Sequence, residues 1–116
     1  ALKAAVTSGW PEVHLVRVNP QGKYMDGEDI RWDGQSATEV PPVMEQIKLM
    51  HDKGRGVIGM KLIGNGDFKD PADREKAARF AMACKDIDAV VIGFASEQQV
   101  DEAIDRINRA LAAAEA

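Results

Sequence analysis

The chain has 116 residues, of which 45% are hydrophobic, and a formal net charge of −4. This length suits one domain of modest size, and the hydrophobic content predicts a folded core. The acidic balance argues against nucleic acid as a partner, because proteins that bind it usually carry a basic face. No apolar run approaches the length that crosses a bilayer, so no membrane partner is expected. A single cysteine, Cys84, excludes an internal disulfide framework.

The first residues already have the pattern of a helix. Leu2, Ala5 and Val6 recur at helical spacing, no N-cap residue precedes them, and Ser8-Gly9 ends the pattern. We therefore expect residues 1–116 to be a segment of a longer chain. They contain no signal-peptide pattern, which favours a cytoplasmic location, with any export signal lying upstream of Ala1.

Apolar segments typical of strands alternate with helical segments along the rest of the chain. Runs rich in valine and isoleucine predict strands over 13–18, 56–63 and 89–92. A polar, glycine-containing loop over 23–36 follows the first strand, and a loop of this length is often functional. The next helix begins near Thr38, buries Val43, Ile47 and Met50, and ends at Gly54.

Start signals mark the last two helices. Asp70 and Pro71 form an N-cap and a proline in the first turn, and Ser96 with Gln99 matches the capping box. The tail from Ala112 is expected to fray. The apolar stripes of these helices are Ala77, Phe80, Ala81 and Cys84, and then Val100, Ile104, Ile107 and Leu111.

One helix followed by three β/α units predicts a single segment, residues 1–116, of the α/β class with a parallel sheet. The loops that follow parallel strands gather at one edge of the sheet, where ligand sites of α/β folds lie. Three strands cannot close a barrel, and their two open edges invite pairing. The segment should therefore belong to a larger barrel or associate with itself.

Three stretches carry a resemblance to a known family: VHLVRVNP at 13–20, GVIGMKLIGNG at 56–66 and VIGFASEQQV at 91–100. Together they resemble the C-terminal part of aldo/keto reductases, in particular bacterial oxidoreductases of that family. The resemblance implies a (β/α)8 TIM barrel, with strands six to eight in this chain and more than half of the barrel elsewhere. It also implies hydride transfer between NADP or NAD and an aldehyde or ketone.

The resemblance assigns no catalytic residue to this chain. The family's catalytic aspartate, tyrosine, lysine and histidine lie on earlier strands, so the segment alone is expected to be inactive. The residues that it places at the cofactor lie on the last two loops and the last helix. Those along the pyrophosphate would be Lys61, Ile63, Gly64 and Asn65; those at the adenosine phosphate and adenine would be Gly93, Phe94, Ala95, Gln99 and Glu102.

Physical chemistry supports an anion at the last loop, because a strand that feeds a helix through a short loop presents unpaired N–H groups to a phosphate. The basic residue that often meets the 2′-phosphate in the family is missing, and Ala103 stands where an asparagine is frequent. Both NAD and NADP therefore stay open. The alternative is that Gln99 and Glu102 form only a helix cap and a solvated surface.

Lys61 has two open interpretations, since a lysine in an apolar strand needs a partner. It either contacts the cofactor or pairs with an acid of a neighbouring strand. By the resemblance, Met60 stands where an aromatic residue commonly stacks on nicotinamide.

Further candidates for the substrate pocket lie on the first strand and the long loop. Arg17 and Asn19 share a face with Leu15 by strand alternation and approach the site if that face points into a barrel. The alternative for Arg17 is an internal ion pair. Trp32 is a candidate for lining the pocket. Neither histidine has the partners of a metal ligand, so no metal is expected.

Other functions remain open at this point. The chain could be a stand-alone, self-associating β/α module that binds a phosphate-containing ligand without catalysis. A weaker alternative is a fragment of another phosphate-binding barrel such as an aldolase, for which Lys61 would be the candidate Schiff-base lysine.

Overall fold

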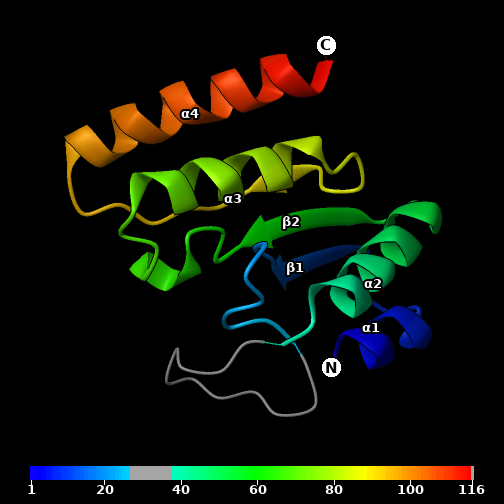
Figure 1. The fold of residues 1–116 in the computed structure, drawn as a ribbon. Coiled ribbons are helices and arrows are strands. Elements are labelled where there is room, and N and C mark those ends of the chain that lie inside the picture. The colour runs from blue at the N-terminus through cyan, green and yellow to red at the C-terminus, as the bar shows by residue number, and fades with distance from the viewer. Residues whose placement is uncertain (27–37, 116) are drawn as a thin grey trace.

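The computed structural model of this chain describes residues 1–26 and 38–115. Within them the protein is a mixed α/β structure with four α-helices and one parallel sheet in the strand order β1-β2-β3 (Figure 1). The predicted α/β class with parallel strands is confirmed, and the candidate Trp32 lies outside the described residues. The elements are α1 (Leu2–Ser8), β1 (Val13–Arg17), α2 (Val40–Asp52), β2 (Gly56–Met60), the 3-10 helix η1 (Gly64–Gly66), α3 (Pro71–Ala83), β3 (Ala89–Val90) and α4 (Glu97–Glu115).

The helix ends follow the local signals in the sequence. Two prolines occupy the first turn of α2, where a missing N–H does no harm, and Gly54 follows its end with a φ of 75°. At the start of α3 the Asp70 carboxylate accepts a hydrogen bond of 2.9 Å from the backbone N–H of Ala72. The predicted inner face of α2 is confirmed, because Val43, Ile47 and Met50 are at most 3% exposed.

Four of the predicted limits are wrong. β2 ends at Met60 instead of residue 63, because Lys61 adopts a φ of 60°, which no strand residue has. β1 ends at Arg17, so Asn19 does not share a strand face with Leu15. β3 is only two residues long, and α4 continues to Glu115 instead of fraying from Ala112.

The two faces of the sheet have different surroundings. On one face, Val16, Val18 and Val57 are at most 1% exposed and join the core formed with α2 and α3. The other face carries Leu15, Ile58 and Ala89, which are paired across the three strands. Val13 and Leu15 on that face are 57% and 59% exposed. Parallel sheets are normally covered on both faces, so this face is unusually open.

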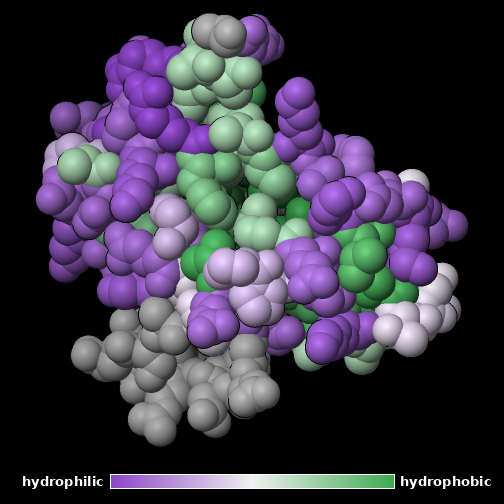
Figure 2. All heavy atoms as spheres, turned by 45° about the vertical axis from the view of Figure 1, so that its right-hand side comes forward, coloured by the Kyte–Doolittle hydropathy of each residue, from purple (hydrophilic) through white to green (hydrophobic). Residues whose placement is uncertain are grey.

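Helix α4 packs on α3, and α3 lies between α4 and the strands (Figure 1). The predicted apolar stripe of α4 is only partly covered: Ile107 is half-buried, whereas Val100, Ile104 and Leu111 are 36% to 54% exposed. The buried residue of α4 is Ala110. Figure 2 shows a band of hydrophobic side chains that runs down one face of the molecule between hydrophilic flanks. None of the described helices is both long and apolar enough to cross a membrane.

A buried histidine joins α1 to the sheet. His14 on β1 is 5% exposed, and its Nε2 lies 3.3 Å from Nη1 of Arg55, which also donates to the carbonyl oxygen of Val6 at 3.1 Å. An arginine beside the ring requires the neutral imidazole, whose nitrogen accepts the bond. Burial, and then the positive charge of Arg55, lower the pKa of His14 below its usual value of 6.5.

This lowered pKa predicts a pH-dependent stability. Below pH 6.5 the unfolded chain takes up a proton that folded His14 refuses, so the free energy of unfolding should fall as the pH drops from 6.5 towards the lowered pKa. Above pH 6.5 the contribution is fully present. Urea unfolding from about pH 8 to about pH 5 measures it. The variant His14→Gln should flatten the profile in this window; equal profiles for His14→Gln and the parent protein would contradict the prediction.

Candidate functional site

A cavity of about 900 Å³ lies at the carboxyl ends of β2 and β3 and is also lined by residues of α3 and α4. Its walls come from Leu15 on β1, from the end of β2 and the loop after it, from the loop after β3, and from α3 and α4. The lining residues include Met60, Lys61, Asn65, Phe94, Gln99 and Glu102 from the predicted set, and also Lys69, Arg74 and Arg106.

The cavity gathers most of the residues that the sequence nominated. Eight of the nine cofactor candidates line it, as does Met60; Gly64 does not line it but directly precedes Asn65. The two candidates from β1 and the loop after it do not line it. Arg17 lies 4.0 Å from a carboxylate oxygen of Asp26, which is the ion pair considered as the alternative. Asn19 is 1% exposed and forms its hydrogen bonds within the protein.

Lys61 brings a positive charge to the cavity directly after β2. Its Nζ donates a hydrogen bond of 2.7 Å to Oδ1 of Asn65, four residues later. Both residues have left-handed backbone conformations, with φ of 60° and 58°. A neutral amide leaves the charge of the ammonium uncompensated. Among the described residues, the side-chain partner of Lys61 is therefore Asn65 and not an acid of a neighbouring strand.

The loop before α4 is closed by its own capping interactions. The backbone N–H of Gln99 donates to Oγ of Ser96 at 3.3 Å, and Oε1 of Gln99 accepts from the N–H of Ala95 at 2.8 Å. The predicted capping box is thus present, except that the Gln99 side chain accepts from the N–H of Ala95 and not from that of Ser96. Since the Ala95 N–H already has an acceptor, an anion at this loop would have to meet other groups or displace the Gln99 side chain.

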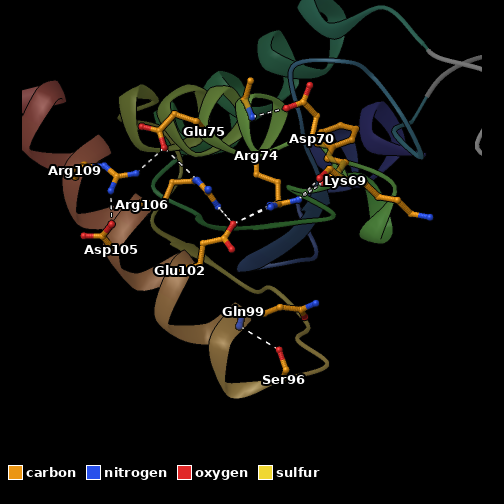
Figure 3. Close-up of polar contacts among 12 residues, drawn as sticks. Lys69, Asp70, Arg74, Glu75, Ser96, Gln99, Glu102, Asp105, Arg106 and Arg109 are labelled. Carbon is orange, nitrogen blue, oxygen red and sulfur yellow. Dashed lines mark hydrogen bonds and ion pairs between the residues drawn. The ribbon is translucent and has the colours of Figure 1, made fainter.

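A network of ion pairs joins α4 to α3 beside the cavity (Figure 3). Glu102 accepts from Arg74 at 2.9 Å and from Arg106 at 2.7 Å. Glu75 accepts from Arg106 at 3.1 Å and from Arg109 at 3.0 Å. These hydrogen bonds lower the pKa of both carboxyl groups: that of Glu75 chiefly through Arg109, and that of Glu102 chiefly through Arg106 and then Arg74.

The sequence did not nominate Arg74 and Arg106 for the site. The Glu102–Arg106 pair follows the i, i+4 spacing and could have been read from the sequence. Arg74 lies 28 residues before Glu102, so no local pattern reveals that pair. Arg74 also donates to the carbonyl oxygens of Phe68 and Lys69 at 3.0 and 2.6 Å, and it thereby fixes the loop after β2 to α3.

The charges around the cavity oppose the net charge of the chain. Among the described residues, four basic side chains and one acidic side chain line it. Arg74 and Arg106 pair with the acidic one, Glu102, and Arg106 also pairs with Glu75, whereas Lys61 and Lys69 have no carboxylate partner among these residues. The chain as a whole carries −4. Such a basic cavity in an acidic protein attracts an anionic ligand, and its apolar lining, including Met60 and Phe94, suits a ligand with flat organic groups.

The network predicts that acid loosens α4. Both carboxyl groups have pKa values below their usual 4.5 in the folded protein, so their contribution to stability is present above pH 4.5 and is lost as the pH falls through the lowered values. Amide hydrogen exchange at about pH 6 and about pH 3.5, corrected for intrinsic rates, should show protection lost first in α4. Loss of protection in α2 before α4 would contradict this.

Within the described residues, no group of three or more His, Cys, Asp or Glu side chains is placed to hold a metal ion. Fold and cavity together define the class: a parallel α/β protein with a basic pocket at the carboxyl edge of its sheet. Comparisons with family models, curated proteins and solved structures find no match for the chain.

Proposed function

We propose that the cavity binds a nicotinamide dinucleotide, NAD or NADP, through its pyrophosphate. The chain would then be the C-terminal, cofactor-binding portion of a (β/α)8-barrel oxidoreductase that resembles the aldo/keto reductases and acts on an aldehyde or ketone. A cytoplasmic location belongs to the same proposal.

One observation carries the proposal. Residues that the resemblance assigns to cofactor, from two loops more than 25 residues apart, line a single cavity together with Lys61, whose charge no described carboxylate compensates. This cavity lies at the carboxyl edge of a parallel sheet, where α/β proteins bind their ligands.

The groups in the cavity fit a dinucleotide. Its volume, about 900 Å³, is within the range of small-molecule sites. Lys61 offers an ammonium to the pyrophosphate, and Met60 offers a polarizable surface to a flat ring. Arg74 on α3 and Arg106 on α4 add positive charge at the side of the cavity formed by these helices. When bound, the cofactor would supply the hydride, while these side chains hold and orient it.

The open face of the sheet supports the barrel part of the proposal. The face with Val13 and Leu15, which in a barrel would point into the lumen, is more than half exposed at both residues. Val100, Ile104 and Leu111 of α4 are exposed as well. Further β/α units would cover both surfaces and would bring the catalytic residues, which the proposal does not assign to this chain.

Isothermal titration with NAD, NADP and inorganic pyrophosphate tests the proposal. We expect both dinucleotides to bind in a one-to-one ratio, and pyrophosphate to compete with them, without turnover of any carbonyl compound by residues 1–116 alone. Binding of adenosine that is as tight as that of NAD would show that the pyrophosphate contributes nothing. Failure of all three ligands to bind would overturn the proposal.

The exposed sheet face also favours a second candidate, a self-associating β/α module that binds a phosphate-containing ligand without catalysis. Light scattering on the purified chain separates the two. A stable oligomer that binds pyrophosphate but neither dinucleotide favours the module, whereas a monomer that binds a dinucleotide favours the reductase portion.

A further inference from the structure

The loop after β1 is organised around one buried amide. The Asn19 side chain is 1% exposed, and its Oδ1 accepts from the backbone N–H groups of Gln21 and Lys23, both at 3.1 Å. Its Nδ2 donates to the carbonyl oxygen of Lys23 at 2.8 Å and to that of Lys61 at 3.1 Å. All of its hydrogen-bonding capacity is therefore used, and one of its four bonds crosses to the loop that carries the cavity lysine.

Lys61 needs such support because its backbone is strained. A φ of 60° in a residue with a side chain costs about 1–2 kcal/mol and persists only where the surroundings hold it. The preceding residue is held by the bond from Val18 N–H to the Met60 carbonyl oxygen at 2.9 Å. The carbonyl oxygen of Lys61 accepts from the local backbone N–H of Gly64 at 3.0 Å and from the Asn19 side chain, which is its link to the loop after β1. The left-handed turn ends the strand at this point and brings the ammonium to Asn65 at the cavity wall.

We propose that Asn19 is a positioning residue: its buried amide fixes the left-handed conformation of Lys61 and thereby sets the lysine ammonium in the cavity for a pyrophosphate-containing ligand. The ligand in this statement rests on the proposed function, whereas the link between Asn19 and Lys61 does not. Asn19 therefore acts through Lys61, from outside the cavity, and not as the direct pocket contact expected from the sequence.

An amide suits this position better than any other small side chain. It presents two acceptor sites to two N–H groups and two hydrogens to two carbonyl oxygens. An aspartate has the same shape and keeps the acceptors, but it sets a charged oxygen against the carbonyl oxygens of Lys23 and Lys61. Asn19→Asp is therefore the sharpest variant, and Asn19→Ser is a milder one that keeps the protein folded if the first does not.

A thermodynamic cycle tests the link without any ligand. Glycine adopts a φ of 60° freely, so Lys61→Gly removes the strain that Asn19 is proposed to support. We expect Asn19→Asp to lower the melting temperature by about 6 °C in the parent protein and by about half as much in the Lys61→Gly background. Equal losses in both backgrounds would overturn the link, and so would a Lys61 backbone whose NMR shifts stay left-handed in Asn19→Asp.

A second cycle tests the consequence for binding, with inorganic pyrophosphate and NAD as probes. Asn19→Ser should weaken binding roughly fivefold in the parent protein and should have almost no further effect in Lys61→Gln. The matched control is Tyr24→Phe, which removes a different hydrogen bond between these loops, from Tyr24 to Asp67 at 2.7 Å. It should lower stability but leave affinity unchanged.

The outcomes separate this inference from the proposed function. If the stability cycle shows coupling but neither probe binds the parent protein, the proposed function fails and the conformational role of Asn19 stands. If both probes bind and depend on Lys61, but Asn19→Ser weakens binding equally in the two backgrounds, the proposed function stands and the positioning role is overturned.

Discussion

Replacing Gly64 with alanine is expected to destabilise the protein by about 3 kcal/mol. A β-carbon at this position would lie 2.5 Å from Cε1 and 2.7 Å from Cδ1 of Phe68, far inside contact distance. Phe68 is 3% exposed, so its ring has little room to move. In addition, the φ of 60° at Gly64 is a conformation that alanine avoids. Urea unfolding of both proteins measures the difference.

Gly66 provides the matched control two residues later. Its φ of 91° also disfavours a side chain, but a β-carbon there would have nothing within 4 Å. Gly66→Ala should therefore destabilise by only about 1 kcal/mol, the backbone contribution alone. Similar losses for the two variants would show that the contact with Phe68 does not matter.

The parts of the fold that depend on neighbouring residues were predictable from the sequence. The start of α3 at Pro71 follows from Asp70, whose short carboxylate reaches the N–H of Ala72 within the same turn. The inner face of α2 follows from helical spacing, because the face is covered by the adjacent sheet. The individual cavity residues were expected from the family resemblance, and only their meeting at one place follows from topology, since loops after parallel strands gather at one edge of the sheet.

The parts that depend on distant residues were not predictable. The left-handed conformation of Lys61 could not be predicted, because besides the local bond from Gly64 N–H the groups that bond Met60 and Lys61 are Val18 and Asn19, more than 40 positions earlier. The pair between Arg74 and Glu102 likewise joins two helices separated by a strand. The stripe on α4 was recognised, but periodicity gives only the direction of an apolar face and not what covers it.

Lys61→Gln is expected to weaken the binding of NAD, NADP and inorganic pyrophosphate about 20-fold, since a hydrogen bond from an ammonium to a phosphate is stronger than one from a neutral amide. Lys61 donates to the neutral Asn65 and to no described carboxylate. Removal of its charge therefore strands no buried acid. Stability should change by less than about 0.5 kcal/mol. Isothermal titration and urea unfolding of the same preparation measure the two effects.

Lys69 is the matched control for the charge of Lys61. It lines the same cavity, but it is exposed, and its charge is screened by water and salt. Lys69→Gln should weaken pyrophosphate binding only about twofold, and added salt should reduce this small effect further while the effect of Lys61→Gln persists. Equal effects of the two substitutions would mean that the cavity attracts anions only through its overall potential. Unchanged affinity in Lys61→Gln, with tight binding in the parent protein, would place the pyrophosphate elsewhere on the molecule.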